Sequence, residues 1–240
     1  MLSNAEGNIV IVGTGAGIGM SIAHRFGREG HPVTLIARNL PKLQTFQAEL
    51  QQAGIEASIY EADAANFTKI AAALQQIEQQ QGTPDVVIYN VAALSRWQGW
   101  QSFNPELLLT DFRVTVASCL AVVQATALGM QQRSSGTILV TSATAESYLP
   151  LPLTSLRISK PGLNELITVL HDELKPQGIH VSAMKVRGPV RQLGDYDPDA
   201  VAQEYWRIFQ QKPLFWKPLE ELTAERLSAF RRDKEKQQIH

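Results

Sequence analysis

Three glycines in the segment GTGAGIG are spaced to bind a phosphate group. Gly13, Gly17 and Gly19 follow a short apolar run and open a segment with helical spacing. Glycines allow a tight strand-to-helix turn, so backbone N–H groups and a helix N-terminus can approach a pyrophosphate. A purely structural turn is the alternative, but the position between the first strand and the first helix favours phosphate binding. We predict that Gly13, Gly17, Ile18 and Gly19 contact a dinucleotide.

The end of the second apolar run, IARN, bears on which dinucleotide is bound. An NAD-preferring site carries an acidic residue there, which accepts a hydrogen bond from the ribose 2′-hydroxyl. Ala37 removes that carboxylate, and Arg38 supplies a guanidinium that suits bidentate pairing with a 2′-phosphate. We therefore expect NADP(H) rather than NAD(H). The alternative is that Arg38 is only a solvated residue at a strand end.

These residues need a parallel sheet to position them. Six apolar runs predict buried parallel strands, at residues 8–13, 32–38, 56–62, 85–90, 136–142 and 178–186. Segments with helical spacing alternate with them, at residues 18–30, 40–54, 67–82, about 105–133, about 153–175 and 198–211. The alternation predicts an α/β fold, a Rossmann-type doubly wound parallel sheet of six to seven strands in a single domain over residues 1–240.

Two segments near the C-terminus depart from this alternation. A stretch rich in Gly, Pro and Asp begins a predicted substrate-lid-like segment at about residues 187–212. The charged sequence RRDKEKQQIH is expected to form a solvated or frayed tail at about residues 231–240.

Composition and net charge argue against several kinds of binding site. A net charge of −1 with mixed signs gives no basic surface for nucleic acid or membrane lipid. The single cysteine, Cys119, excludes an internal disulfide and is expected to be a small buried thiol. The five histidines show no metal-ligand spacing, so we expect no metal. Because no cationic region precedes the first apolar run, we expect a cytoplasmic protein.

The chain resembles the short-chain dehydrogenase/reductase family from about Asn8 to Val190. The matching segments are VGTGAGIG, EADAAN, YNVA, GTILVTSATA, SLRISKPGLNEL and GIHVSAMKVRGPV. The resemblance implies that Asp63 holds the adenine ring. It also places Asn90 in the family's Asn-Ala-Gly motif and Gly188 in its Pro-Gly turn. A small-molecule substrate and a homodimer or homotetramer are further implications.

The resemblance also shows what is missing. The family transfers a proton with Tyr-x-x-x-Lys, and here Leu156 stands at the position of the tyrosine while Lys160 is retained. The helper serine aligns with Ala143, beside Ser142, and the fourth residue, an asparagine, aligns with Thr115. Losing a positioned general acid typically slows a reaction by ~10²–10⁴-fold. Hydride transfer to an ordinary ketone should therefore be severely slowed.

Several roles remain open for the residues that are present. Lys160 is either a lysine that binds the nicotinamide ribose or a surface lysine on an amphipathic helix. Ser142 or Thr144 could bind a substrate oxygen, and Tyr148 could reach inward from its loop. We take Lys160 and Ser142 as the candidate catalytic residues.

Two functions fit these residues. The first is an NADP(H)-dependent oxidoreductase with weak or non-standard hydride transfer to a carbonyl or another acceptor. The second is a catalytically inactive pseudoenzyme that binds the cofactor and acts as a sensor, scaffold or subunit.

Overall fold

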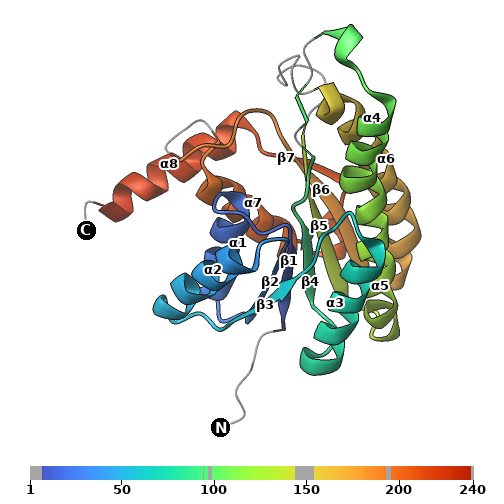
Figure 1. Ribbon diagram of the computed structural model, residues 1–240. Helices are drawn as coiled ribbons and strands as arrows, with labels where there is room; N and C mark the ends of the chain where they lie inside the picture. The colour runs from blue at the N-terminus through green and yellow to red at the C-terminus, as the bar shows by residue number, and fades with distance from the viewer. Residues whose placement is uncertain (1–6, 94, 97–98, 144–153, 193–195, 239–240) are drawn as a thin grey trace.

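A sheet of seven parallel strands forms the centre of the computed structural model, which describes residues 7–93, 95–96, 99–143, 154–192 and 196–238 (Figure 1). Its strand order is β3-β2-β1-β4-β5-β6-β7. The strands are β1 (Ile9–Val12), β2 (Val33–Ala37), β3 (Ala57–Glu61), β4 (Val86–Tyr89), β5 (Gly136–Ala143), β6 (Ile179–Val186) and β7 (Leu219–Glu221). The first six confirm the predicted apolar runs, whereas the sequence pattern predicted no strand at β7.

Helices cover both faces of the sheet (Figure 1). One layer contains α1 (Ile18–Gly27), α2 (Leu40–Gln52) and α7 (Pro198–Phe209). The other contains α3 (Phe67–Gln81), α5 (Ser118–Gln132) and α6 (Thr154–Leu174). Alternate residues of β1 enter the two cores: Ile9 and Ile11 pack in one, and Val10 and Val12 in the other. Burial on both faces explains why the strands are continuous apolar runs.

The helices α2 and α3 begin at asparagine side chains. Asn39 Oδ1 accepts a hydrogen bond from the backbone N–H of Lys42 at 3.0 Å, and Asn66 Oδ1 does the same for Lys69. Both asparagines thus satisfy one of the free N–H groups of a first helical turn. The cap at Asn39 fixes the start of α2 directly after β2, which places Lys42 one turn beyond Arg38.

The predicted helix at about residues 105–133 is interrupted. It consists of α4 (Pro105–Phe112), a π-helical turn at Arg113–Ala117, and α5. Such turns are rare and often lie at functional sites. The turn contains Thr115, which is buried and whose hydroxyl accepts a hydrogen bond from the backbone N–H of Ala93 at 3.3 Å. The turn therefore joins the helix to the segment that follows β4.

The predicted lid-like segment at about residues 187–212 stays a prediction, although its helical part packs in the core. Its helical part is α7, which packs on α1 and buries Val201, Tyr205 and Ile208 completely. Its apolar residues recur at helical spacing and therefore belong to the core. Of that segment, the described residues before α7 are 187–192 and 196–197. At the predicted tail, α8 (Ala224–Gln238) continues as a helix as far as Gln238.

His180 is a buried histidine that should make stability depend on pH. It lies in β6, and its ring stacks on Trp216 with the ring centroids 4.7 Å apart. Neither ring nitrogen has a hydrogen-bond partner among the residues that the structure describes. Burial lowers the pKa of His180 from 6.5 to about 3, and the nearby charges of His171 and Lys175 act in the same direction.

We predict that this histidine lowers stability in acid. Between pH 6.5 and 3 the unfolded chain holds a proton that the folded protein does not, so the free energy of unfolding falls as the pH falls. The loss approaches about 1.4 kcal/mol per pH unit for one such group. His180→Phe keeps a stacked ring and removes the titration. Urea unfolding from pH 7 to 4.5 should show a growing advantage of the variant, and a constant difference would contradict the prediction.

Candidate functional site

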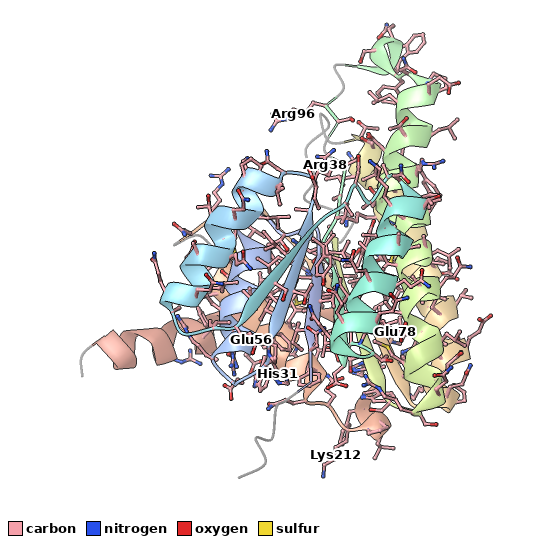
Figure 2. The ribbon with its side chains drawn as sticks, turned by 60° about the horizontal axis from the view of Figure 1, so that its bottom comes forward. His31, Arg38, Glu56, Glu78, Arg96 and Lys212 are labelled. Carbon is pink, nitrogen blue, oxygen red and sulfur yellow. The ribbon has the colours of Figure 1, made fainter. Side chains whose placement is uncertain are left out.

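A cavity of about 670 Å³ opens at the C-terminal ends of the strands β1 to β4. Figure 2 shows Arg38 at this end of the sheet and His31 and Glu56 at the opposite end. The strand order reverses between β1 and β4, where ligands bind in such sheets. The wall comes from the ends of these strands and from α4: Val12, Gly13, Thr14, Gly15, Ala37, Arg38, Asn39, Lys42, Ala62, Asp63, Ala64, Asn90, Val91, Ala92, Ala93, Ser95, Leu107, Thr110, Asp111 and Val114.

The glycine turn meets the geometric demands of a phosphate site. Gly13 has φ +88°, and a Cβ there would lie 2.6 Å from Val91 Cγ2, so only glycine fits. Gly17 precedes α1, and a Cβ there would meet nothing within 4 Å, which leaves open space before the helix N-terminus. A phosphate fits that space. Gly17, Ile18 and Gly19 follow the cavity wall along the chain and start α1, where Ile18 packs on the core.

Two cations lie in the wall after β2. Arg38 was predicted there, and Lys42 joins it from the first turn of α2. Lys42 was not predicted, although the sequence contains a signal for it: Asn39 is a strong helix N-cap, and the residue three positions later lies in the first turn. The predicted Asp63 and Asn90 also line the cavity. This wall thus presents two cations, a carboxylate and an amide to a ligand in the cavity.

A chain of hydrogen bonds supports the glycine turn from behind. Asn90 Nδ2 donates to the carbonyl oxygen of Gly13 at 3.0 Å, and Asn90 Oδ1 accepts from the hydroxyl of Thr141 at 2.7 Å. Because that hydroxyl donates to Asn90, the hydroxyl of Tyr205, 2.6 Å away, must donate to Thr141. Burial raises the pKa of Tyr205, which keeps its proton in place. Thr141 and Tyr205 were not predicted, since no sequence motif marks either residue.

Lys160 belongs to the same network. It is 4 % exposed, and its Nζ donates to the carbonyl oxygen of Thr141 at 2.7 Å. The interpretation of Lys160 as a surface lysine is therefore wrong. Burial lowers its pKa from 10.5 to about 8, an effect that Cys119, itself buried, partly opposes. Lys160 does not form part of the described cavity wall.

The other residues predicted around Lys160 do not converge on a catalytic group. Ser142 is buried and its hydroxyl donates to Asn164 Oδ1 of α6 at 2.5 Å, an arrangement that does not support a catalytic role. Leu156 is 6 % exposed, and Ala143 is half-buried at the end of β5. The alternatives Thr144 and Tyr148 lie outside the described residues.

Gly188 and the arginine that precedes it serve local structure. A Cβ on Gly188 would lie 2.7 Å from the ring of Tyr196, so glycine allows a close approach there. Arg187 forms an ion pair with Glu221 of β7. Gly188 is half-buried and does not line the described cavity, so its predicted contact with the cofactor stays a prediction.

The described residues hold no metal cluster and no membrane-spanning helix. No group of three or more His, Cys, Asp or Glu side chains there is placed to hold a metal ion. No helix in the same ranges is long and apolar enough to cross a membrane.

Comparison with curated proteins adds relatives of modest identity. The 3-dehydrosphinganine reductase TSC10B of Arabidopsis thaliana is 27% identical over 181 residues, which cover 74% of this chain and 53% of that protein. A putative ketoacyl reductase of Streptomyces coelicolor is 28% identical over 177 residues, 73% of this chain and 67% of that protein. The chain thus matches about half the length of the plant relative.

Solved structures share the fold, and a family model covers most of the chain. A short-chain dehydrogenase from Rhodopseudomonas palustris superposes with a TM-score of 0.80 at 26% identity, covering 90% of this chain and 97% of that one. A metagenomic short-chain oxidoreductase in complex with NADP gives 0.81 at 24% identity, over 90% and 96% of the two chains. The model of the short chain dehydrogenase family matches residues 7–190. With the sheet, the glycine turn and the cavity as described, the chain belongs to the short-chain dehydrogenase family.

Proposed function

We propose that the protein is an oxidoreductase that binds NADP(H) in the cavity at the ends of β1 to β4. The observation that carries this proposal is the pair of cations, Arg38 and Lys42, in the cavity wall where an NAD-preferring site has a carboxylate. Two cations at that position favour a 2′-phosphate over a 2′-hydroxyl.

In this proposal, different residues bind different parts of the dinucleotide. The open space before Gly17 and the N-terminus of α1 receives the pyrophosphate. Asp63 contacts the adenine ring, as the family resemblance implies. Asn90 keeps the glycine turn in place through Gly13. When bound, the dinucleotide supplies the hydride.

Lys160 holds the nicotinamide ribose in this proposal. Its pKa of about 8 leaves it mostly protonated at pH 7, so it donates hydrogen bonds as an ammonium group. Its bond to Thr141 ties that function to the support of the glycine turn. The lysine is therefore a binding and positioning residue.

Proton transfer limits the choice of acceptor. If Leu156 and Ala143 stand at the positions of the family's tyrosine and serine, no side chain there can protonate a substrate oxygen. A loss of ~10²–10⁴-fold follows for a ketone that needs a general acid. The acceptor that suits such a site is an activated carbonyl or a quinone, which needs little proton assistance.

The alternative is a cofactor-binding pseudoenzyme. Two observations favour this alternative. Leu156 is buried and apolar, and the hydroxyl of Ser142 is already bonded to Asn164, so neither side chain offers a polar group to a substrate. In either case a homodimer or homotetramer is expected. Large apolar side chains are exposed along α4, α5 and α6, a surface that a second copy can cover: Leu109, Phe112, Leu128, Ile158 and Val169.

We predict that Arg38→Ala and Lys42→Ala each weaken NADPH binding and leave NADH binding nearly unchanged. Each removes one charge-assisted interaction with the 2′-phosphate, which corresponds to about 10–100-fold in Kd. Fluorescence titration with both cofactors measures the effect. Arg28→Ala, an exposed arginine at the end of α1, is the matched control. Equal weakening of NADH, or no NADPH binding by the wild type, would overturn the proposal.

Lys160→Met should stabilise the protein while it weakens cofactor binding. The lowered pKa of Lys160 corresponds to a net cost of a few kcal/mol for keeping the ammonium group buried at pH 7, with its hydrogen bond to Thr141 already in place. The folded protein releases the lysine proton near pH 8 and the unfolded chain near pH 10.5, so wild-type stability rises over that interval. The advantage of the variant in urea unfolding should therefore shrink from pH 8 to 10.5. Lys212→Met, at an exposed lysine, should show neither effect.

The double variant Leu156→Tyr, Ala143→Ser separates the two functions. If the protein is an oxidoreductase whose site lacks only its acid, NADPH-dependent ketone reduction should rise by about 10²-fold or more. The assay follows NADPH absorbance with a panel of ketones, dicarbonyls and quinones. No turnover by the wild type and no gain in the double variant, with NADPH binding retained, would favour the pseudoenzyme.

A further inference from the structure

One buried carboxylate in the cavity wall is only half satisfied. Asp111, near the end of α4, is 3 % exposed and lines the cavity. Its Oδ1 accepts a hydrogen bond from the hydroxyl of Ser95 at 2.9 Å. Its Oδ2 is buried and has no hydrogen-bond partner in the described structure.

A buried oxygen without a hydrogen-bond partner destabilises the folded protein. Buried polar atoms almost always have a hydrogen-bond partner, and each one that lacks it costs roughly 1–3 kcal/mol, more when the group is charged. A leucine of similar size would avoid that cost. A carboxylate kept beside a cavity is therefore explained most simply by a partner that enters the cavity.

Asp111 lies on a different part of the cavity wall from the cations that we assign to the 2′-phosphate. Arg38 and Lys42 come from the end of β2 and the start of α2, whereas Asp111 comes from α4 and Ser95 from the segment after β4. The cavity is thus basic where it meets α2 and acidic where it meets α4. The wall on either side of Asp111 is apolar, with Leu107 and Val114 one turn away.

Three hydrogen-bond donors of the chain that come from α6 and from the segment after β4 are not bonded to Asp111. Lys160 donates to Thr141, and Ser155, at the start of α6, donates to the carbonyl oxygen of Ser95. Arg96 follows Ser95 and is exposed, on the same side of the molecule as Arg38 (Figure 2). Within the described residues, Oδ2 of Asp111 thus has no hydrogen-bond partner from the chain itself.

We propose that Asp111 and Ser95 form a subsite that binds a hydrogen-bond donor of the substrate, with an ammonium group preferred. A carboxylate only accepts hydrogen bonds, and a buried one gains most from a donor that also carries positive charge. The Ser95 hydroxyl, which already donates to Asp111, keeps lone pairs that accept from the same group. The apolar neighbours suit a hydrocarbon or aromatic body. This inference rests on the proposed function, since it assigns the basic end of the cavity to the cofactor.

The test uses three probes of one shape and different charge: benzylamine, benzyl alcohol and benzoate. Calorimetric titration of the full chain, with and without saturating NADPH, should show binding in the order benzylamine, benzyl alcohol, benzoate. The amine should bind about tenfold or more tightly than the alcohol. Benzoate that binds as tightly as benzylamine would overturn the proposal.

Variants locate the effect. Asp111→Asn keeps the shape and removes the charge, so the preference for benzylamine should fall at least tenfold. Ser95→Ala, a second variant in case the first fails to fold, should lower benzylamine affinity by a smaller factor. Asp172→Asn, at an exposed aspartate of α6, should change nothing. An unchanged preference in Asp111→Asn, or an equal loss in Arg96→Ala, would contradict the assignment.

The two proposals fail in different ways. If NADPH does not bind but the amine preference depends on Asp111, the cofactor proposal falls and the subsite stands. If NADPH binds and no probe is preferred, the subsite falls and the cofactor proposal stands.

Discussion

The hydrogen bond from Asn90 to the carbonyl oxygen of Gly13 holds the site together. It crosses the point where the strand order reverses, and so it fixes the glycine turn of β1 against the end of β4. Thr141 and Tyr205 orient the Asn90 amide, which would otherwise be free to rotate. Lys160 bonds to the backbone of the same threonine. The network thus joins the ends of β1 and β4 to β5, α6 and α7, and α7 takes part although it lies in the opposite layer from α6.

The fold could be read from the sequence because burial on both faces gives parallel strands a continuous apolar signal. β1 to β6 show that signal. β7 has only three residues, and two of them are glutamates, so its pairing with β6 follows from its neighbours in space. The π-helical turn was also missed, since an amphipathic pattern changes little over one added residue. The position of α7 could not be read because an amphipathic helix fits a lid and a core layer equally well.

Site residues could be predicted from the sequence only where they directly follow a predicted strand. Gly13, Arg38, Asp63 and Asn90 follow strand ends, and all four line the cavity. The contacts of Lys160 join segments far apart in sequence, so no local pattern reveals its burial. Ser142 shows a different limit. Alternation along β5 directs Thr141 toward Tyr205 and Ser142 toward Asn164, so neighbours in sequence serve opposite layers of the molecule.

The π-helical turn at Arg113–Ala117 makes the cavity sensitive to chain length. It accommodates one residue more than an α-helical turn, and removing that residue would rotate α4 by about 100° relative to α5. Leu107, Thr110 and Asp111 would then leave the wall together, while Thr115 and the sheet stayed in place. A single insertion or deletion could therefore exchange one set of ligand contacts for another without any change to the core.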